Sequence, residues 1–537
     1  LFIVTRYREA LAQGFGPEAA TAVAVDTAGR AVIFAGATVV VSLLGLLLVG
    51  LPFISGLGYG AAITVAVVMV ASTTLLPAAL GLVGERVNVT RWRGIAASGL
   101  ISVALLGLGL SIQPFLIGLP LAVVIAVIGY LPFAGPLKRQ LPPRKQVPIR
   151  DTVWYRWSRT VQARPWAWAI GGTALLLFLT IPLLSLNMGF SDEGNFPEDT
   201  TTRKAYDLLA EGFGPGSNGP FLIVTEISSP ADLETLGTLS ATLNQTEGVA
   251  FASPPLPNDP NSPEAAMIQL QPATAPQAVE TEELVETLRE ELVPAAVAGT
   301  ELSPKVTGLT PANIDFTGFL SGRILLFFGV VLALSFCLLT AVFRSILVPL
   351  KAVIMNMLSI GAAYGIVVAV FQWGWGGFLF GIEPAPIEPF IPMMMFAIVF
   401  GLSMDYEVFL LSRVKEEFER TGDPVNSVAD GLAMTARVIT AAAAIMVVVF
   451  GSFVFEDNRI VKLFGLGLSM AVLIDASLVR MLLVPSTMQL LGARNWWLPD
   501  WLDRLLPNLN VEGGHHEPPA VDEVHEEEEG DREPALL

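Results

Sequence analysis

The sequence predicts a polytopic α-helical membrane protein made of two parallel repeats, with one extracytoplasmic α/β domain. Three observations carry this prediction. Of the 537 residues, 53% are hydrophobic and only 15% are charged. Long runs contain no Asp, Glu, Lys or Arg, and the two ends of the chain resemble each other in sequence. A soluble protein rarely combines these features.

The uncharged runs set the number of spans, because a helix needs about 20 apolar residues to cross a bilayer. The 54-residue run 31–84 is long enough for two spans with a turn near Gly50, and the 44-residue run 94–137 breaks at Pro114 into two more. Ten spans are predicted, near 31–51, 55–80, 95–112, 115–136, 166–186, 322–343, 349–371, 389–411, 437–455 and 461–484.

Charge distribution predicts the orientation of these spans. Residues 138–164 carry eight basic residues and one acidic residue, Asp151, so the positive-inside rule places them in the cytoplasm. Residues 187–321, with 20 acidic and 4 basic residues, then lie outside. The acidic tail 512–537 lies inside and is predicted to be disordered. We expect a multi-pass protein of a bacterial plasma (inner) membrane.

An internal repeat relates the start of the chain to its last third. The opening LFIVTRYREALAQGFGPEAA lies over VFLLSRVKEEFERTGDPVNS, pairing Arg6 with Arg413 and Arg30 with Arg437 at an offset of 407 residues. Such similarity is typical of transporters built from two related halves. Both copies enter from the same side, which makes the repeat parallel. Since the chain opens as the last turn of a span, we expect it to be truncated within its first half and not to transport in this form.

The exterior segment is predicted to be an α/β domain. Strands are expected near 220–227, 248–252, 266–271 and 304–309, with helices near 231–244 and 277–293. The order of strand, helix, two strands, helix and strand is that of the split, ferredoxin-like unit.

The candidate functional residues begin with Asp405 and Tyr406, inside the predicted span 389–411. A carboxylate in an apolar span costs roughly 2.5–3.5 kcal/mol, so it usually faces a bundle interior and marks an ion or proton route. Burial disfavours the charged form of a carboxylate, which lets it take up a proton during a cycle. We predict a proton relay here; the alternative is a hydrogen-bonded node that only holds helices together.

Asp475, in the last span, is a further candidate for the relay, or else pairs with a basic residue on a neighbouring helix. Arg480 lies five residues on, roughly 140° around an α-helix, so no pair within the helix is expected and Arg480 is predicted to snorkel to the interface. Glu407, Arg413 and Arg437 are expected to anchor the helices at the cytoplasmic boundary.

These features resemble the MMPL family of the RND transporter superfamily. The resemblance rests on GLSMDYEVFLLSR, on GFSDEGNFPEDTTTRKAYDLLAEGFGPGSNGP and on LVPSTMQLLGARNWWLP, and it spans most of 1–90 and 165–500. It implies an RND-type fold with a porter-like exterior domain, and export of lipids or other hydrophobic compounds driven by protons. It also implies one Asp-Tyr pair per half at the bundle centre; only Asp405 and Tyr406 match, and the hairpin 94–136 is an insertion.

The domain organisation follows from these points. We expect the end of a first-half bundle at 1–84, an inserted hairpin at 94–136 and a basic cytoplasmic linker at 137–164. The second half then comprises its first span at 165–186, a porter-like domain at 187–321, a bundle at 322–493 and an acidic cytoplasmic tail, predicted to be disordered, at 494–537.

The expected partners are a hydrophobic cargo, protons and membrane lipids. Phe390, Met394 and Phe396 are candidates for contact with the cargo, although an aromatic belt at the membrane surface explains such residues more often. No cofactor, metal or nucleic acid is expected, since the three histidines all lie in the acidic tail. Homo-oligomer formation is left open.

Other functions remain open at this stage. The sequence has no G-x-x-x-x-G-K-[ST] motif, so no ATPase site is evident. Two aspartates within spans, Asp405 and Asp475, make an intramembrane aspartyl protease the best enzyme alternative. A lipid- or sterol-sensing membrane protein without transport is the other alternative.

Overall fold

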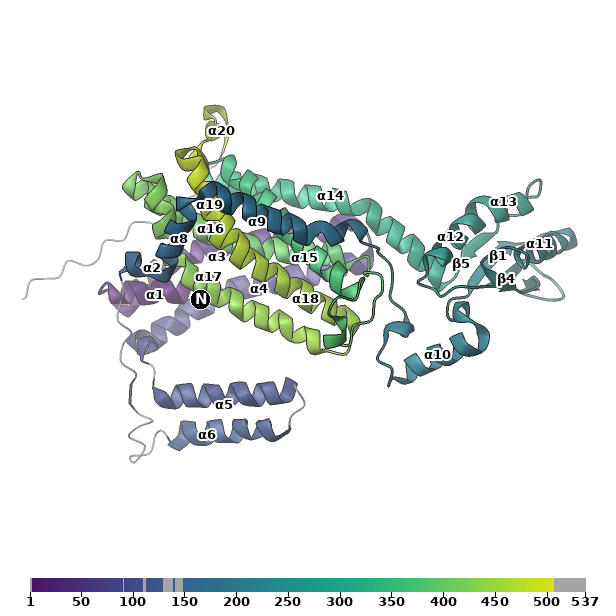
Figure 1. Ribbon diagram of the computed structural model, residues 1–537, viewed down its shortest axis with the longest axis horizontal. Helices are drawn as coiled ribbons and strands as arrows, with labels where there is room; N and C mark the ends of the chain where they lie inside the picture. Colours follow the sequence, from purple (N-terminus) through teal and green to yellow (C-terminus); the bar gives the residue numbers. More distant parts are fainter. Residues whose placement is uncertain (1, 90, 110–112, 129–138, 141–147, 507–537) are drawn as a thin grey trace, which may run out of the picture. The chain divides into compact units, whose positions relative to one another are not determined.

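The computed structural model describes residues 2–89, 91–109, 113–128, 139–140 and 148–506 and is mostly helical (Figure 1). The chain divides into two compact units. The first comprises Leu1–Ile33, Val68–Val147 and Val511–Leu537, and the second comprises Phe34–Val67 and Pro148–Asn510. The tail 494–537 was predicted to be disordered. This is wrong for its described residues 494–506, which include the helix α20 (Asp500–Leu505), and the rest of the tail lies outside the described part.

Eight stretches of helix are long and apolar enough to cross a membrane, by length and composition, within the described residues. They are Pro17–Val49, Pro52–Asn88, Pro165–Ser185, Leu309–Phe343, Leu347–Phe371, Ile391–Thr421, Pro424–Phe455 and Arg459–Trp496. The chain is therefore a multi-pass membrane protein. The other two predicted spans correspond to α5 (Trp92–Gly109) and α6 (Gly118–Ile128), which pack against each other and whose predicted ends fall on residues that the structure does not describe.

Prolines and glycines set many of the helix ends. The N-terminal helices are α1 (Phe2–Ala12), α2 (Pro17–Ala24), α3 (Arg30–Leu44) and α4 (Pro52–Val83), and Gly50 supplies the left-handed residue, at φ 78°, in the turn between α3 and α4. The later helices outside the exterior segment are α8 (Val153–Ala163), α9 (Pro165–Thr180), α14 (Leu309–Phe343), α15 (Leu347–Phe371), α16 (Ile391–Thr421), α17 (Pro424–Ser452), α18 (Arg459–Ile474), α19 (Val484–Leu491) and α20 (Asp500–Leu505).

Helices begin at matching positions in the two predicted repeats. The second helix of each repeat begins at Pro17 in one copy and at Pro424 in the other, and these prolines are separated by the offset of the sequence repeat. Proline favours the first turn of a helix because its missing N–H has no partner there anyway. The copies differ at their ends, where α4 runs as regular helix through residues 67–75 while the matching stretch of the second copy is a π-helix.

The first unit has a small core of its own. Tyr7 is fully buried and donates a hydrogen bond from its hydroxyl to the carbonyl of Leu80, at 3.1 Å. The packing around it is apolar and small, from Ile3, Ala10, Ala20, Ala24 and Ala28.

Within the second unit, α15, α16 and α18 are the most buried spans, while the most apolar stretch of α17 is only 17% buried. Close approach depends on glycine at two positions, because a Cβ at Gly365 of α15 would overlap the carbonyl of Leu179 and one at Gly467 of α18 would overlap Met395. Polar side chains on α15, α16 and α18 are therefore kept away from lipid.

Residues 187–321, called the exterior segment after their predicted location, hold an antiparallel sheet with strands β1 (Phe221–Glu226), β2 (Val249–Ala252), β3 (Leu256–Pro257), β4 (Ala265–Pro272) and β5 (Lys305–Thr307). The strand order is β2-β4-β1-β5, with β3 paired to β4, and the central register places Ile223 opposite Ile268. Helices α11 (Pro230–Leu243) and α12 (Val279–Thr287) cover the sheet, and α12 continues through the π-helix Leu288–Leu292 into α13 (Val293–Ala296). The four predicted strands and two predicted helices are confirmed within a few residues of their ends.

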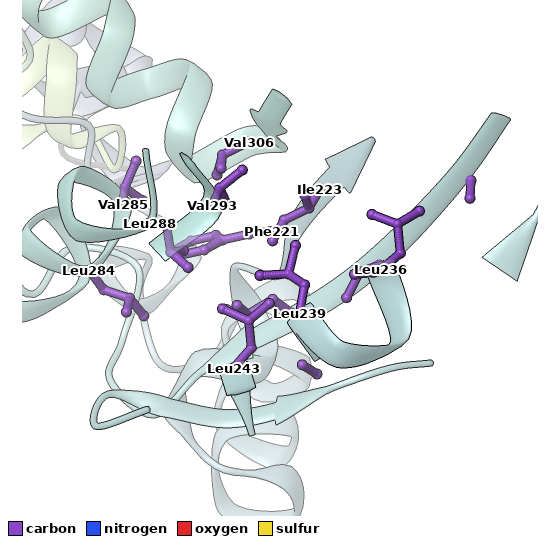
Figure 2. Packing of buried hydrophobic residues seen from close by; sticks show 14 of the residues in the cluster. Phe221, Ile223, Leu236, Leu239, Leu243, Leu284, Val285, Leu288, Val293 and Val306 are labelled. Carbon is purple, nitrogen blue, oxygen red and sulfur yellow. The ribbon is translucent and has the colours of Figure 1, made fainter. Parts of the chain in front are cut away.

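Figure 2 shows the core of this segment, in which alternate residues of the strands meet one face of each helix. Phe221, Ile223 and Val306 come from the sheet, and Leu239 and Leu288 come from the helices. The helix α10 (Thr201–Phe213) was not predicted from the sequence, and it has no buried residue in the structure. The helix α14 begins at Leu309 and runs without a break through the predicted domain boundary at 321, so it includes the predicted span 322–343 and extends it toward the sheet (Figure 1).

Candidate functional site

The candidate site lies midway along α16, where polar and charged residues interrupt the apolar span. Ser403, Tyr406 and Glu407 are buried, and Asp405 is nearly so. Met404 and Val408 are buried around them, so this stretch faces helices on more than one side. A helix that is buried nearly all round can hold such groups only where other helices supply their partners.

Asp475 and Arg480 form a buried ion pair within one helix, which corrects the prediction that five residues separate them too far. Arg480 Nε lies 2.9 Å from Asp475 Oδ2, and the arginine is only 1% exposed. The residues Asp475–Leu483 form a π-helix. Its hydrogen bonds join residues five apart, so positions i and i+5 share a face. Arg480 therefore does not snorkel; it neutralises Asp475 inside the bundle.

Ser403 connects this pair to two other helices. Its hydroxyl lies 2.9 Å from Asp475 Oδ1 and 2.7 Å from Asn356 Oδ1, while its carbonyl accepts a hydrogen bond from Arg480. The network joins α15, α16 and the π-helix. Sequence analysis did not find Ser403 or Asn356, because neutral polar residues are common in spans and no charge distinguishes these two.

Tyr406 packs against the same arginine. The Arg480 guanidinium carbon lies 5.2 Å from the centre of the Tyr406 ring, and the tyrosine hydroxyl donates to Met446 Sδ at 3.5 Å. A small cavity beside the network is lined by Ser403, Tyr406 and Asp475 among others. Two of the three predicted relay residues thus meet at one point.

Asp405 lies within electrostatic range of Arg480, and its Oδ1 atom is buried with no hydrogen-bond partner among the described residues. A buried carboxylate oxygen without a partner is costly when it is charged. Binding a proton at this carboxylate removes that penalty. The role of Asp405, Tyr406 and Asp475 as a relay remains a prediction.

Glu407 was predicted to anchor α16 at the interface, and this is wrong. Glu407 is only 3% exposed and interacts with Arg480 and with Lys351 of α15. Lys351 is buried as well, and its Nζ and the Oε1 of Glu407 have no hydrogen-bond partner among the described residues. Arg413 pairs with Glu416 at 2.6 Å, and Arg437 is exposed, as expected at a boundary.

A second buried ion pair lies at the other end of these helices. Arg459, the first residue of α18, contacts both oxygens of Glu388 at 2.9 and 3.1 Å, and it donates to the carbonyls of Phe371 and Ala385. Ser191, in the irregular chain that leads to the exterior segment, donates to Glu388 at 2.5 Å. This outer network, Ser191–Glu388–Arg459, joins α18 to the chain that enters the exterior segment.

The predicted cargo residues are in different environments. Phe396 is fully buried and stacks on Phe328, with ring centres 4.0 Å apart, so it belongs to the packed interior. Phe390 is half-buried and contacts Phe53 and Phe190 at 6.1 and 6.5 Å between ring centres. Met394 is half-buried one turn along α16.

Outside the spans, Asp192 and Tyr206 form a partly buried pair. The tyrosine hydroxyl donates to Asp192 Oδ2 at 2.9 Å. Burial raises the pKa of Asp192 above its usual value, although the hydrogen bond from Tyr206 acts in the opposite direction. The pKa of Tyr206 is also raised, first by burial and then by the neighbouring carboxylate of Asp192. In the part of the chain that the structure describes, no cluster of His, Cys, Asp or Glu could hold a metal ion.

Comparison with known proteins agrees with this architecture. The sequence model of the MMPL family matches residues 1–167 and 244–506, which is most of the chain. The chain belongs to the MMPL family. Both halves of the predicted repeat, and the span that carries Asp405 and Tyr406, lie within the matched residues.

Several curated relatives have similar sequences. Membrane protein YdfJ of Bacillus subtilis is 36% identical over 96% of this chain and 63% of its own length. The mycolic acid-containing lipids exporter MmpL11 of Mycolicibacterium smegmatis is 32% identical over 95% of this chain and 49% of its own length. The trehalose monomycolate exporter MmpL3 of Mycobacterium tuberculosis is 31% identical over 95% and 52%. The chain thus spans between half and two thirds of the length of these relatives.

Proposed function

We propose that this MMPL chain is part of a transporter that exports lipid-like compounds across the plasma membrane, driven by protons that bind and leave Asp405. The observation that carries the proposal is the partnerless Oδ1 of Asp405 beside the buried Ser403–Asp475–Arg480 network. Relatives named as exporters of mycolic lipids and of trehalose monomycolate support the class of cargo.

The charges in the network suggest how a proton acts. With Asp475 already paired to Arg480, an ionised Asp405 adds a second negative charge near the same guanidinium. The guanidinium of Arg480 cannot fully neutralise two carboxylates at once. Protonating Asp405 removes one of the two negative charges, so it changes the balance between the attraction of Arg480 to Asp405 on α16 and its attraction to Asp475 on the π-helix. One charge crossing 100 mV is worth about 2.3 kcal/mol, enough to bias helix packing when several move per cycle.

The outer network connects a change in the packing of these helices to the exterior segment. Glu388 follows α15 and lies just before α16, Arg459 opens α18, and Ser191 lies in the irregular chain that enters the exterior segment. We assign to that segment a ferredoxin-like porter fold, supported by its strand order β2-β4-β1-β5. Phe390 and Met394 are the proposed cargo contacts, near the point where α16 begins.

An aspartyl protease is less well supported, because such a site needs two carboxylates that share a proton, whereas Asp475 is held by Arg480. A lipid sensor remains the alternative to be tested. The test is proton flux into proteoliposomes of the full-length protein, followed with an internal pH dye, with and without a mycolyl glycolipid in the bilayer. A transporter shows lipid-dependent proton flux that depends on the gradient; a sensor binds the lipid without any flux.

A further inference from the structure

The short helix α8 is bound to the bundle through one face. Ser158, Val161 and Gln162 are buried against it. Trp157 Nε1 donates to the carbonyl of Met481 at 2.8 Å, and Gln162 Nε2 donates to the carbonyl of Val425 at 3.0 Å. These contacts fix the position of α8 on the ends of α17 and the π-helix, and thus also determine which residues face away.

The opposite face of α8 is basic. Arg156, Arg159, Thr160 and Ala163 are exposed at the spacing of three and four residues that places side chains on one side of a helix, and Arg164, which directly follows the helix, is exposed as well. Arg159 bonds Gln162 at 3.2 Å and faces Asp423. Arg156 and Arg164 form no ion pair within the described residues, and residues 152–191 contain no Asp or Glu.

The start of α9 indicates the depth of this face in the membrane. Trp166 and Ile170, one turn apart at the beginning of the span, are 67% and 63% exposed. Exposed tryptophan at the end of a span is typical of the level of lipid headgroups. Arg164 lies two residues earlier, immediately before Pro165 opens the span. Its guanidinium is therefore placed where lipid phosphates lie.

We propose that Arg156 and Arg164 bind the phosphates of anionic phospholipids in the cytoplasmic leaflet. The guanidinium is planar and matches a phosphate with two parallel hydrogen bonds, and the unpaired positive charge of this face complements an anionic surface. The inference goes beyond the proposed function and does not depend on its cargo.

The test is native mass spectrometry of the full-length protein released from nanodiscs that contain equal amounts of phosphatidylglycerol and phosphatidylcholine. Each basic residue near an anionic surface contributes about 1 kcal/mol, which strengthens binding roughly fivefold. The double variant Arg156→Gln with Arg164→Gln should therefore bind phosphatidylglycerol roughly 30-fold more weakly. Arg156→Lys with Arg164→Lys keeps both charges and should lose far less.

Lys204→Gln with Lys305→Gln is the matched control, because it removes the same charge from the exterior segment. Equal retention of phosphatidylglycerol by the Gln variant of α8 and the wild type would overturn the proposal, as would an equal loss in the control. Displacement of the lipid by millimolar inorganic phosphate would also contradict it, since the site would then bind free anions. Circular dichroism of each variant verifies that a loss of lipid is not a loss of fold.

Discussion

Arg480 and Asp475 lie five residues apart in one helix and are nevertheless bonded, Nε to Oδ2, at 2.9 Å inside the bundle. The π-helix that makes this contact leaves the carbonyl of Ser403 as a second acceptor for the same guanidinium. The central charge of the chain is therefore fixed between α16 and the last span, close to Asp405.

Replacing one partner of the Asp475–Arg480 pair should lower the stability of the protein. We predict that Arg480→Gln lowers the free energy of unfolding by about 3–5 kcal/mol, because it leaves Asp475 buried without its counter-charge. The double variant Asp475→Asn with Arg480→Gln should recover much of the loss. Thermal unfolding in detergent measures both, and a double variant no more stable than Arg480→Gln alone would argue against the pair.

The outer network should behave in the same way. We predict that Glu388→Gln destabilises the protein by about 3 kcal/mol, since Arg459 is then buried without compensation. Glu383→Gln is the matched control: its pair with Arg203, at 3.2 Å, is largely exposed and should contribute no more than about 1 kcal/mol. Hydrogen exchange should rise at residues 187–192 in Glu388→Gln only.

Close packing of α15 on α9 gives a prediction about stability alone. Gly365→Ala places a methyl group on the carbonyl of Leu179, which cannot move without displacing α9, so we expect a loss of about 1–3 kcal/mol. Gly329→Ala on α14 meets nothing within 4 Å and should gain up to about 1 kcal/mol from helix propensity. Equal melting temperatures of the two variants would contradict the described packing.

Asp192 predicts a dependence of stability on pH. Burial raises the pKa of this carboxyl above 3.8, so its protonated form is favoured in the folded protein. The buried, protonated carboxyl of Asp192 therefore contributes fully to the free energy of unfolding below pH 3.8. This contribution is lost as the pH rises through the higher pKa that the carboxyl has in the folded protein. Relative to Asp192→Asn, which does not titrate, the wild type should become less stable as the pH rises from 4. A constant difference in melting temperature across that range would contradict the shift.

How far the sequence predicts the structure depends on the type of signal. Apolar length predicted the eight spans, and alternating residues such as Phe221 and Ile223 predicted the strands, because burial imposes those patterns directly. The register of Asp475 and Arg480 was predicted wrongly, since no residue pattern distinguishes a π-helix from an α-helix. Glu407 was misplaced for a related reason: its burial depends on Lys351, which comes from another helix. The role of Asp405 itself is still a prediction.

The most direct test of that role is gradient-driven proton flux through the full-length protein in proteoliposomes, comparing wild type with Asp405→Asn. This substitution keeps the size of the side chain and removes its titration. Asp457→Asn, an exposed aspartate before α18, serves as the control. The account predicts that Asp405→Asn lowers both proton flux and lipid export at least tenfold while lipid binding and the control stay unchanged. Unchanged flux and export in Asp405→Asn would contradict it and leave Asp405 as a residue that only holds the helices together.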